Sequence, residues 1–148
     1  MDLINDINIA KELILNKNNS IVVINKGVLL TEKIGEGIKP IIESINELKD
    51  KINGSVIGDK ILGKASALLC IYSKARAVYS PKSTNAAISI LSRKGIYYET
   101  DEIIPFIKNK YKNDICPFEK IVENIESPNV AYKILMNKYD KIINLNKK

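Results

Sequence analysis

Small residues, lysines and a carboxylate occur together between Gly58 and Ala67, in a spacing that could bind phosphate. The stretch reads Gly-Asp-Lys-Ile-Leu-Gly-Lys-Ala-Ser-Ala. It nearly matches the loop Gly-x4-Gly-Lys-Ser/Thr, whose backbone N–H groups wrap phosphates while the hydroxyl ligates magnesium. Ala65 stands at the hydroxyl position, the intervening residues are typical of a helix, and no convincing strand precedes them. The sequence therefore favours a helix with small residues for close packing over a nucleotide-binding loop.

Two lysines near the start of this expected helix indicate a simpler kind of anion site. Asp59 is a suitable N-cap, and Lys60 and Lys64 follow one turn apart on one face. Ammonium groups and the first amides of a helix both favour negative charge. Lysines that are merely solvated are the alternative, and the sequence leaves both interpretations open.

A second group of chemically capable residues is Cys116-Pro117-Phe118-Glu119. As structure, it predicts a helix start in which Cys116 is the N-cap, Pro117 opens the first turn and Glu119 reaches back as in a capping box. As chemistry, a cysteine at a helix N-terminus has a lowered pKa and can be a nucleophile. Ser83 also precedes an expected helix, where its hydroxyl is either a plain N-cap or a nucleophile.

The chain contains no histidine and only two cysteines, Cys70 and Cys116. A Ser-His or Cys-His dyad is therefore excluded, as are zinc sites with an imidazole ligand or four thiolates. Cys70 lies in an apolar run and is expected in the core, and both thiols are expected to be reduced. We expect no metal and no cofactor.

The composition is that of an ordinary globular protein. The 148 residues are 45% hydrophobic and 27% charged, with a net charge of +6, which predicts one domain over residues 1–148. The two arginines and scattered lysines argue against nucleic acid as a partner. No apolar run is long enough to span a membrane and the N-terminus lacks a basic signal region, so we expect a cytoplasmic protein.

The spacing of apolar residues predicts the elements that must position these side chains. Helices are expected over residues 2–16, about 41–48, about 59–72, about 84–94, about 117–126 and from Ser127-Pro128 onward. Strands are expected over 20–24 and 28–31 as a hairpin, then over 75–79 and 96–99. The last two strands and the helix between them predict a parallel βαβ crossover. The lysine-rich tail, about 144–148, is expected to fray.

Four segments resemble a family of small bacterial and archaeal proteins that is catalogued as a domain of unknown function with a cytidine-deaminase-like fold. They are Asp59-Lys60-Ile61-Leu62-Gly63-Lys64-Ala65-Ser66-Ala67, Ser83 with Ala86, Ile107-Lys108-Asn109-Lys110, and Cys116-Pro117-Phe118-Glu119. The resemblance runs from about Ser20 to Glu126. The chain departs from the family pattern at Lys110, where Arg is expected, and at Ser66, where Ala is expected.

The resemblance implies a three-layer α/β/α sandwich around a mixed sheet. Deaminases of this fold bind zinc through His or Cys at the start of the central helix and Pro-Cys-x-x-Cys at the next. Here the second segment reads Pro-Lys-Ser-Thr-Asn from Pro81, without a thiol, so zinc-dependent deamination is not expected. The fold places a pocket where the two helix starts meet the sheet. Residues expected around it are Asp59, Lys60, Lys64 and Ser83, with Asn109, Cys116 and Glu119 approaching from the C-terminal part.

Three hypotheses follow, and the sequence does not decide whether the protein is an enzyme. The first is a protein that binds a small anionic or nucleotide-like ligand through Asp59, Lys60, Lys64, Ser83, Asn109 and Glu119. The second is an enzyme with Cys116 as its catalytic nucleophile. The third is an interaction protein without a small-molecule site, such as a homo-oligomer formed through a sheet edge or a helix face.

Overall fold

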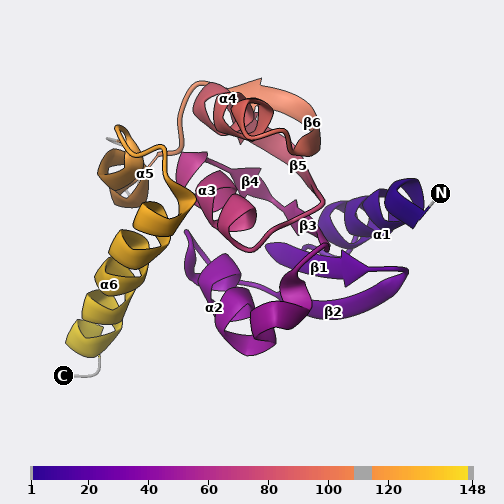
Figure 1. The fold of residues 1–148 in the computed structure, drawn as a ribbon, viewed down its shortest axis with the longest axis horizontal. Coiled ribbons are helices and arrows are strands. Elements are labelled where there is room, and N and C mark those ends of the chain that lie inside the picture. Colours follow the sequence, from indigo (N-terminus) through magenta and orange to yellow (C-terminus); the bar gives the residue numbers. More distant parts are fainter. Residues whose placement is uncertain (1, 109–114, 147–148) are drawn as a thin grey trace.

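A mixed six-stranded sheet forms the centre of the molecule (Figure 1). The structure is a computed structural model that describes residues 2–108 and 115–146. The strands are β1 (Ile21–Asn25), β2 (Val28–Lys33), β3 (Val56–Asp59), β4 (Ile61–Leu62), β5 (Ala77–Thr84) and β6 (Tyr97–Ile104). Strand β1 pairs antiparallel with both β2 and β3, whereas β3, β4 and β6 all run parallel to β5.

Strands β3 and β4 are two parts of one interrupted strand along the same side of β5. Val56 pairs with Ala77 and Ile61 pairs with Lys82, so both parts keep the same register. The interruption at Lys60 lies opposite Pro81, which has no N–H to donate to a neighbouring strand. This break in the centre of the sheet ends β3 at Asp59 and turns the chain toward the helix that follows.

Helices cover both faces of the sheet. They are α1 (Asp2–Leu15), α2 (Lys39–Leu48), α3 (Lys64–Tyr72), α4 (Asn85–Arg93), α5 (Pro117–Val122) and α6 (Pro128–Asn146), with a 3-10 turn over Lys49–Ile52. Helix α1 packs a small core of Ile7, Ala10 and Ile14 against one face. Apolar residues of the other five helices join the larger core on the opposite face. Alternation along β3 therefore points Ile57 and Asp59 toward α3 and Gly58 toward α1.

Helix α6 extends the larger core to one side of the molecule (Figure 1). Ala131 and Leu135 are fully buried, and the Tyr132 ring stacks on the Tyr72 ring of α3 with a centroid distance of 4.0 Å. No helix in residues 2–108 and 115–146 is long and apolar enough to cross a membrane.

The predicted α/β architecture with a mixed sheet is confirmed, as are the first helix, the hairpin, the second helix and the last helix. The narrower assignment to a cytidine-deaminase-like fold stays a prediction. So do the single domain and the fraying of the tail, whose residues 147–148 lie outside the described chain.

The start of the central helix is corrected. It begins at Lys64 rather than at residue 59, and Gly63 is its N-cap. Asp59 ends a strand instead, and that strand does precede the glycine-rich stretch. The reason is that Val56 and Ile57 pair with strands on both sides, and this gain outweighs the local helical spacing.

Three further boundaries differ from the sequence prediction by four residues or more. Strand β5 continues to Thr84, whose hydroxyl accepts a hydrogen bond from the Ala87 amide at 3.1 Å, so Thr84 caps α4 and Ser83 does not. Strand β6 continues to Ile104 because it pairs with β5 along nearly its whole length. Helix α5 ends at Val122, four residues early.

Replacing Gly58 with alanine is expected to destabilise the fold. A Cβ there would lie 2.8 Å from Val22 Cγ2 and 3.1 Å from Ile14 Cγ1, so α1 or β1 must shift, at a cost of about 1–3 kcal/mol. Urea unfolding measures this loss. In the double variant Gly58→Ala/Val22→Ala the nearest clashing atom is gone, and the combined loss should be smaller than the sum of the two single losses. An unchanged urea midpoint for Gly58→Ala would show that α1 does not pack as described.

Candidate functional site

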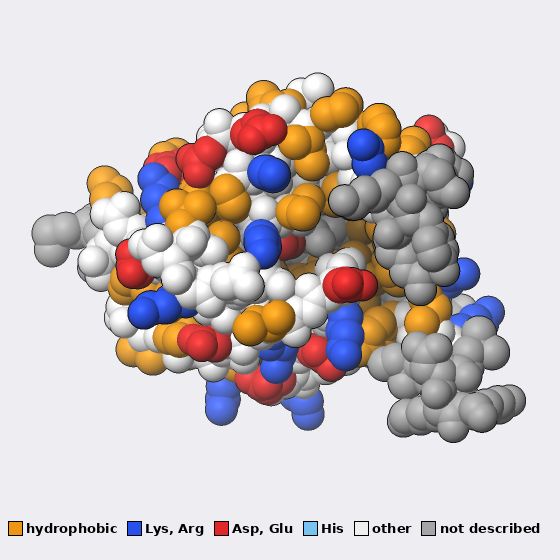
Figure 2. Space-filling model, turned by 180° about the vertical axis from the view of Figure 1, so that it is seen from behind, with side chains coloured by type: hydrophobic (Ala, Val, Ile, Leu, Met, Phe, Trp, Pro, Cys, Tyr) orange, Lys and Arg blue, Asp and Glu red, His pale blue; other side chains and the backbone are white. Residues whose placement is uncertain are grey.

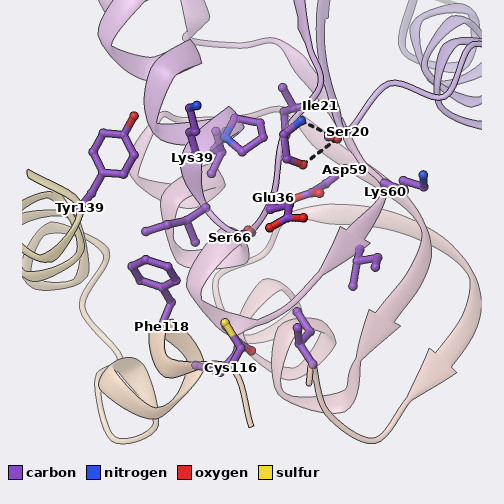
Figure 3. Close-up of a pocket in the computed structure, with 18 of the residues that line it drawn as sticks. Ser20, Ile21, Glu36, Lys39, Asp59, Lys60, Ser66, Cys116, Phe118 and Tyr139 are labelled. Carbon is purple, nitrogen blue, oxygen red and sulfur yellow. Dashed lines mark hydrogen bonds between the residues drawn. The ribbon is translucent and has the colours of Figure 1, made fainter. Parts of the chain in front are cut away.

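A pocket of about 1180 Å³ opens where β3 ends and α3 begins. One wall runs from Gly35 to Ile41 and comprises the segment after β2 and the first turn of α2. The opposite wall is Cys116 to Glu119 together with Tyr139 and Ile142 of α6. Figure 3 shows the two walls facing each other across Asp59 and Ser66. Ligands of open α/β sheets bind at this place, beyond the carboxyl ends of parallel strands.

Asp59 is the buried acid at the floor of the pocket. It is 9% exposed and accepts hydrogen bonds from the backbone N–H of Ile61 and the hydroxyl of Ser66. Burial raises the pKa of Asp59 to about 7, and the nearby Glu119 carboxylate adds to that rise while the two hydrogen bonds oppose it. Near neutral pH this carboxyl can therefore accept or release a proton, which exposed aspartates cannot do.

Glu119 occupies the N-terminus of α3. Its two carboxylate oxygens accept hydrogen bonds from the amides of Lys64 and Ala65, each at 2.8 Å. Burial raises the pKa of Glu119, and these two backbone hydrogen bonds oppose the rise. The expected capping box within α5 is therefore wrong: Glu119 caps a different helix. The helix amides that could have bound a free anion are filled by the protein's own carboxylate.

Gly63 makes this approach of Glu119 sterically feasible. A Cβ on Gly63 would lie 2.5 Å from the Glu119 carboxyl carbon and 2.5 Å from Ile107 Cδ1. The second glycine of the Gly-x4-Gly-Lys pattern thus makes room for a side chain rather than for a phosphate. The close approach of Glu119 therefore explains why a glycine directly precedes Lys64.

Lys64 is a buried lysine that joins the start of α3 to the segment after α5. Its ammonium group donates to the Glu123 carbonyl at 3.0 Å and pairs with Glu126 at 2.8 Å. Glu126 also pairs with Arg93 at the end of α4, and the two cations lower the pKa of its carboxyl. Lys64 therefore secures the segment after α5 and does not line the pocket, although the sequence placed it among the ligand-binding residues.

Lys60 lines the pocket, but its ammonium group donates to Asn18 at 2.7 Å. Since Lys60 lies in the break between β3 and β4, it does not share a helix face with Lys64. The anion site expected from two lysines on one helical turn is therefore not formed.

Ser20 holds the segment after β2 in place as a pocket wall. Its hydroxyl donates to the Gly35 carbonyl at 2.9 Å and accepts from the Gly35 amide at 3.0 Å, as the dashed lines in Figure 3 show. The Ser20 carbonyl also accepts from the Lys60 amide at 2.9 Å. Ser20, the residue before β1, therefore holds both the pocket wall at Gly35 and the break between β3 and β4 at Lys60.

Cys116 and Phe118 come from the opposite wall. Cys116 is partly exposed, lines the pocket and occupies the N-cap position of α5 as predicted, without a hydrogen bond from its side chain to the helix. The ring of Phe118 lies near Gly37, since a Cβ added at that glycine would come 3.6 Å from Phe118 Cε2. The two walls therefore come close together at this point.

Besides Lys64, two predicted site residues cannot be placed in the pocket. Ser83 lies within β5, is 1% exposed and accepts a hydrogen bond from the Thr100 hydroxyl at 2.8 Å. It is not among the residues that line the pocket. Asn109 lies outside the described residues. Ser66, Ser20 and Tyr139 were missed as pocket residues; Ser66 stood out only as a departure from the family pattern.

The described residues offer little to a metal ion. Within 2–108 and 115–146 no three Asp, Glu or Cys side chains gather closely enough to hold one. The polar groups of the pocket suit hydrogen bonding and proton exchange instead.

The contact between Glu119 and Gly63 predicts a non-additive pair of substitutions. Glu119→Ala leaves two helix amides without their partner and should lower the free energy of unfolding by about 1–3 kcal/mol. Gly63→Ala should have a similar effect because it displaces the same carboxylate. The double variant should lose less than the sum, since the carboxylate that clashes with the new Cβ is gone. Urea unfolding measures all three.

Glu123→Gln is the matched control, because Glu123 lies on the same segment and contacts Lys64 only through its carbonyl. Its stability should be unchanged. Fully additive losses in the double variant would contradict the contact.

This chain is similar over most of its length to proteins of one family. A family described as TM1506, a domain of unknown function (DUF1893), matches residues 9–139. The solved structure of a DUF1893 family protein (TM1506) from Thermotoga maritima is 27% identical, covers 90% of each chain and has a TM-score of 0.82. Acinetobacter baumannii RibD is 14% identical, over 68% of this chain and 36% of its own, with a TM-score of 0.49. No curated protein matches. The chain therefore belongs to the DUF1893 family.

Proposed function

We propose that the pocket binds a small nucleotide-like molecule whose ring enters between the two walls and whose polar edge meets Asp59. The observation that carries this proposal is a buried carboxyl at the floor of a large pocket, fixed by Ser66 and by the Ile61 amide. Small-molecule sites commonly combine mainly apolar walls with a few oriented polar groups.

The walls support a ring-shaped ligand. Apolar and aromatic side chains line most of the pocket: Ile21, Ile38, Ile41, Ile61, Ile107, Phe118, Tyr139 and Ile142. Phe118 and Tyr139 lie on the same side in Figure 3, on α5 and α6. An aromatic face binds a flat heterocycle through stacking, at little cost in side-chain entropy.

The charges of the pocket restrict where an anionic group of the ligand can lie. The floor carries the carboxyls of Asp59 and Glu119, and Glu119 already fills the amides of α3. Lys39 and Lys108 are exposed and line the pocket. A phosphate on the ligand therefore belongs near these lysines, and the uncharged ring belongs at the floor.

A binding panel tests the proposal. Nucleobases, nucleosides and nucleoside monophosphates are screened by thermal shift and isothermal titration calorimetry. At least one should bind wild-type protein, and Asp59→Ala and Ser66→Ala should each weaken it about tenfold, because the first removes the carboxyl and the second removes the buried hydrogen bond that orients it. Glu102→Gln, an exposed acid-to-amide change outside the pocket, is the control. Binding that is equal in all four proteins would place the ligand elsewhere, and no binding by any panel member would contradict the proposal.

An enzyme that uses Cys116 is the second candidate, because the Cys116 thiol lines the same pocket. If it is a nucleophile, iodoacetamide should alkylate it at pH 7 faster than it alkylates free cysteine, and a ligand found in the panel should protect it. Cys70 is an internal control, since it is fully buried and burial raises the pKa of its thiol. Mass spectrometry separates the two sites. A rate at Cys116 equal to that of free cysteine would count against this candidate.

A further inference from the structure

The environment of Asp59 defines the hydrogen-bonding pattern that a ligand must present. Asp59 ends β3, pairs in register with Ile21 of β1 and points toward α3. Two donors reach its carboxyl from inside the protein, the Ile61 amide and the Ser66 hydroxyl. Because Asp59 also lines the pocket, its remaining hydrogen-bonding capacity is available to a ligand.

The charged and titratable groups around Asp59 do not balance a negative charge. Glu119, from α5, brings a second carboxylate near it. The ammonium groups of Lys60 and Lys64 are engaged by Asn18 and by Glu126, respectively. Cys70 of α3 faces Asp59 as a buried thiol, and Glu36 adds another acid to the pocket lining. Among the described residues no ion pair includes Asp59.

Burial beside another carboxylate favours the neutral form of an acid. The pKa of Asp59, about 7, agrees with this arrangement. Burial raises the pKa of Glu119 as well, but the nearby Lys64 ammonium group opposes that rise, whereas the charged neighbour of Asp59 is a carboxylate. The two acids therefore have different environments, although they line one pocket.

We infer that Asp59 meets its ligand as the neutral acid, so that the pocket selects a ring edge on which a hydrogen-bond acceptor lies next to an N–H donor. This inference rests on the proposed binding function. A neutral carboxyl offers one O–H donor beside one carbonyl acceptor. It therefore pairs with a lactam or with an aminated ring nitrogen through two parallel hydrogen bonds. An ionised carboxyl offers only acceptors and would instead select a cation with two donors, such as an amidinium.

In this arrangement Glu119 is a positioning residue, and NMR titration of the carboxyl carbons tests its effect without any ligand. Asp59 should titrate near neutral pH in the wild-type protein. Glu119→Gln removes the neighbouring charge and should lower the pKa of Asp59. Ser66→Ala removes a donor that stabilises the charged form and should raise it. Glu123→Gln should leave it unchanged. An Asp59 that titrates in the ordinary range of aspartate would overturn the inference.

Four simple probes then test the selectivity. 2-Pyridone and 2-aminopyrimidine, which stay uncharged through the range, present an acceptor next to a donor. Pyrimidine presents acceptors only, and benzamidine is a cation with two donors. Calorimetry from pH 5 to 9 should show the first two binding best at low pH, with Kd rising about tenfold per pH unit above the pKa of Asp59. Asp59→Asn should remove this pH dependence.

The outcomes separate the two proposals. Tightest binding of benzamidine, increasing with pH, would overturn the neutral-acid inference while supporting the pocket as a binding site. Equal, pH-independent binding of pyrimidine and 2-aminopyrimidine would do the same. Failure of every probe and of every nucleotide-like molecule to bind would overturn both proposals.

Discussion

The two hydrogen bonds from the α3 amides to Glu119 are the interaction on which the candidate site depends. They join the first turn of the central helix to α5, which lies more than fifty residues later in the chain. A carboxylate satisfies orphan N–H groups and matches the positive end of the helix dipole. The contact also requires Gly63, because any side chain at that position would occupy the space of the carboxylate. One wall of the pocket is fixed to its floor in this way.

The other wall depends on a second polar contact of the same kind. Ser20 exchanges two hydrogen bonds with Gly35, so the segment between β2 and α2 is held beside the start of β1. The break between β3 and β4, opposite Pro81, lies next to this contact and places Asp59 between the two walls. The pocket is thus formed by chain segments that lie beyond the same ends of the strands. Hydrogen bonds between residues distant in the sequence hold each wall in place.

The two acids of the site differ in the charge of the group beside them, although both are buried carboxyls. Burial raises the pKa of each, and two hydrogen-bond donors oppose that rise at each, but the Glu119 carboxylate raises the pKa of Asp59 further whereas the Lys64 ammonium group lowers that of Glu119. Lys64, a lysine buried beside them, pairs with Glu126 and so does not neutralise Asp59. Among the described residues the polar floor therefore lies inside apolar walls without an ion pair to Asp59.

The sequence by itself determined the elements with a strong periodic pattern: the first helix, the hairpin, α2 and the last helix, and with them an α/β fold around a mixed sheet. It also named Asp59, Cys116 and Glu119, all of which line the pocket. Only the tertiary structure decided what they do. Val56 to Asp59 became a strand because neighbouring strands pair with it on both sides, and Glu119 capped α3 because folding brought α5 there. Contacts between distant segments leave no local pattern, so spacing along the chain could not show them.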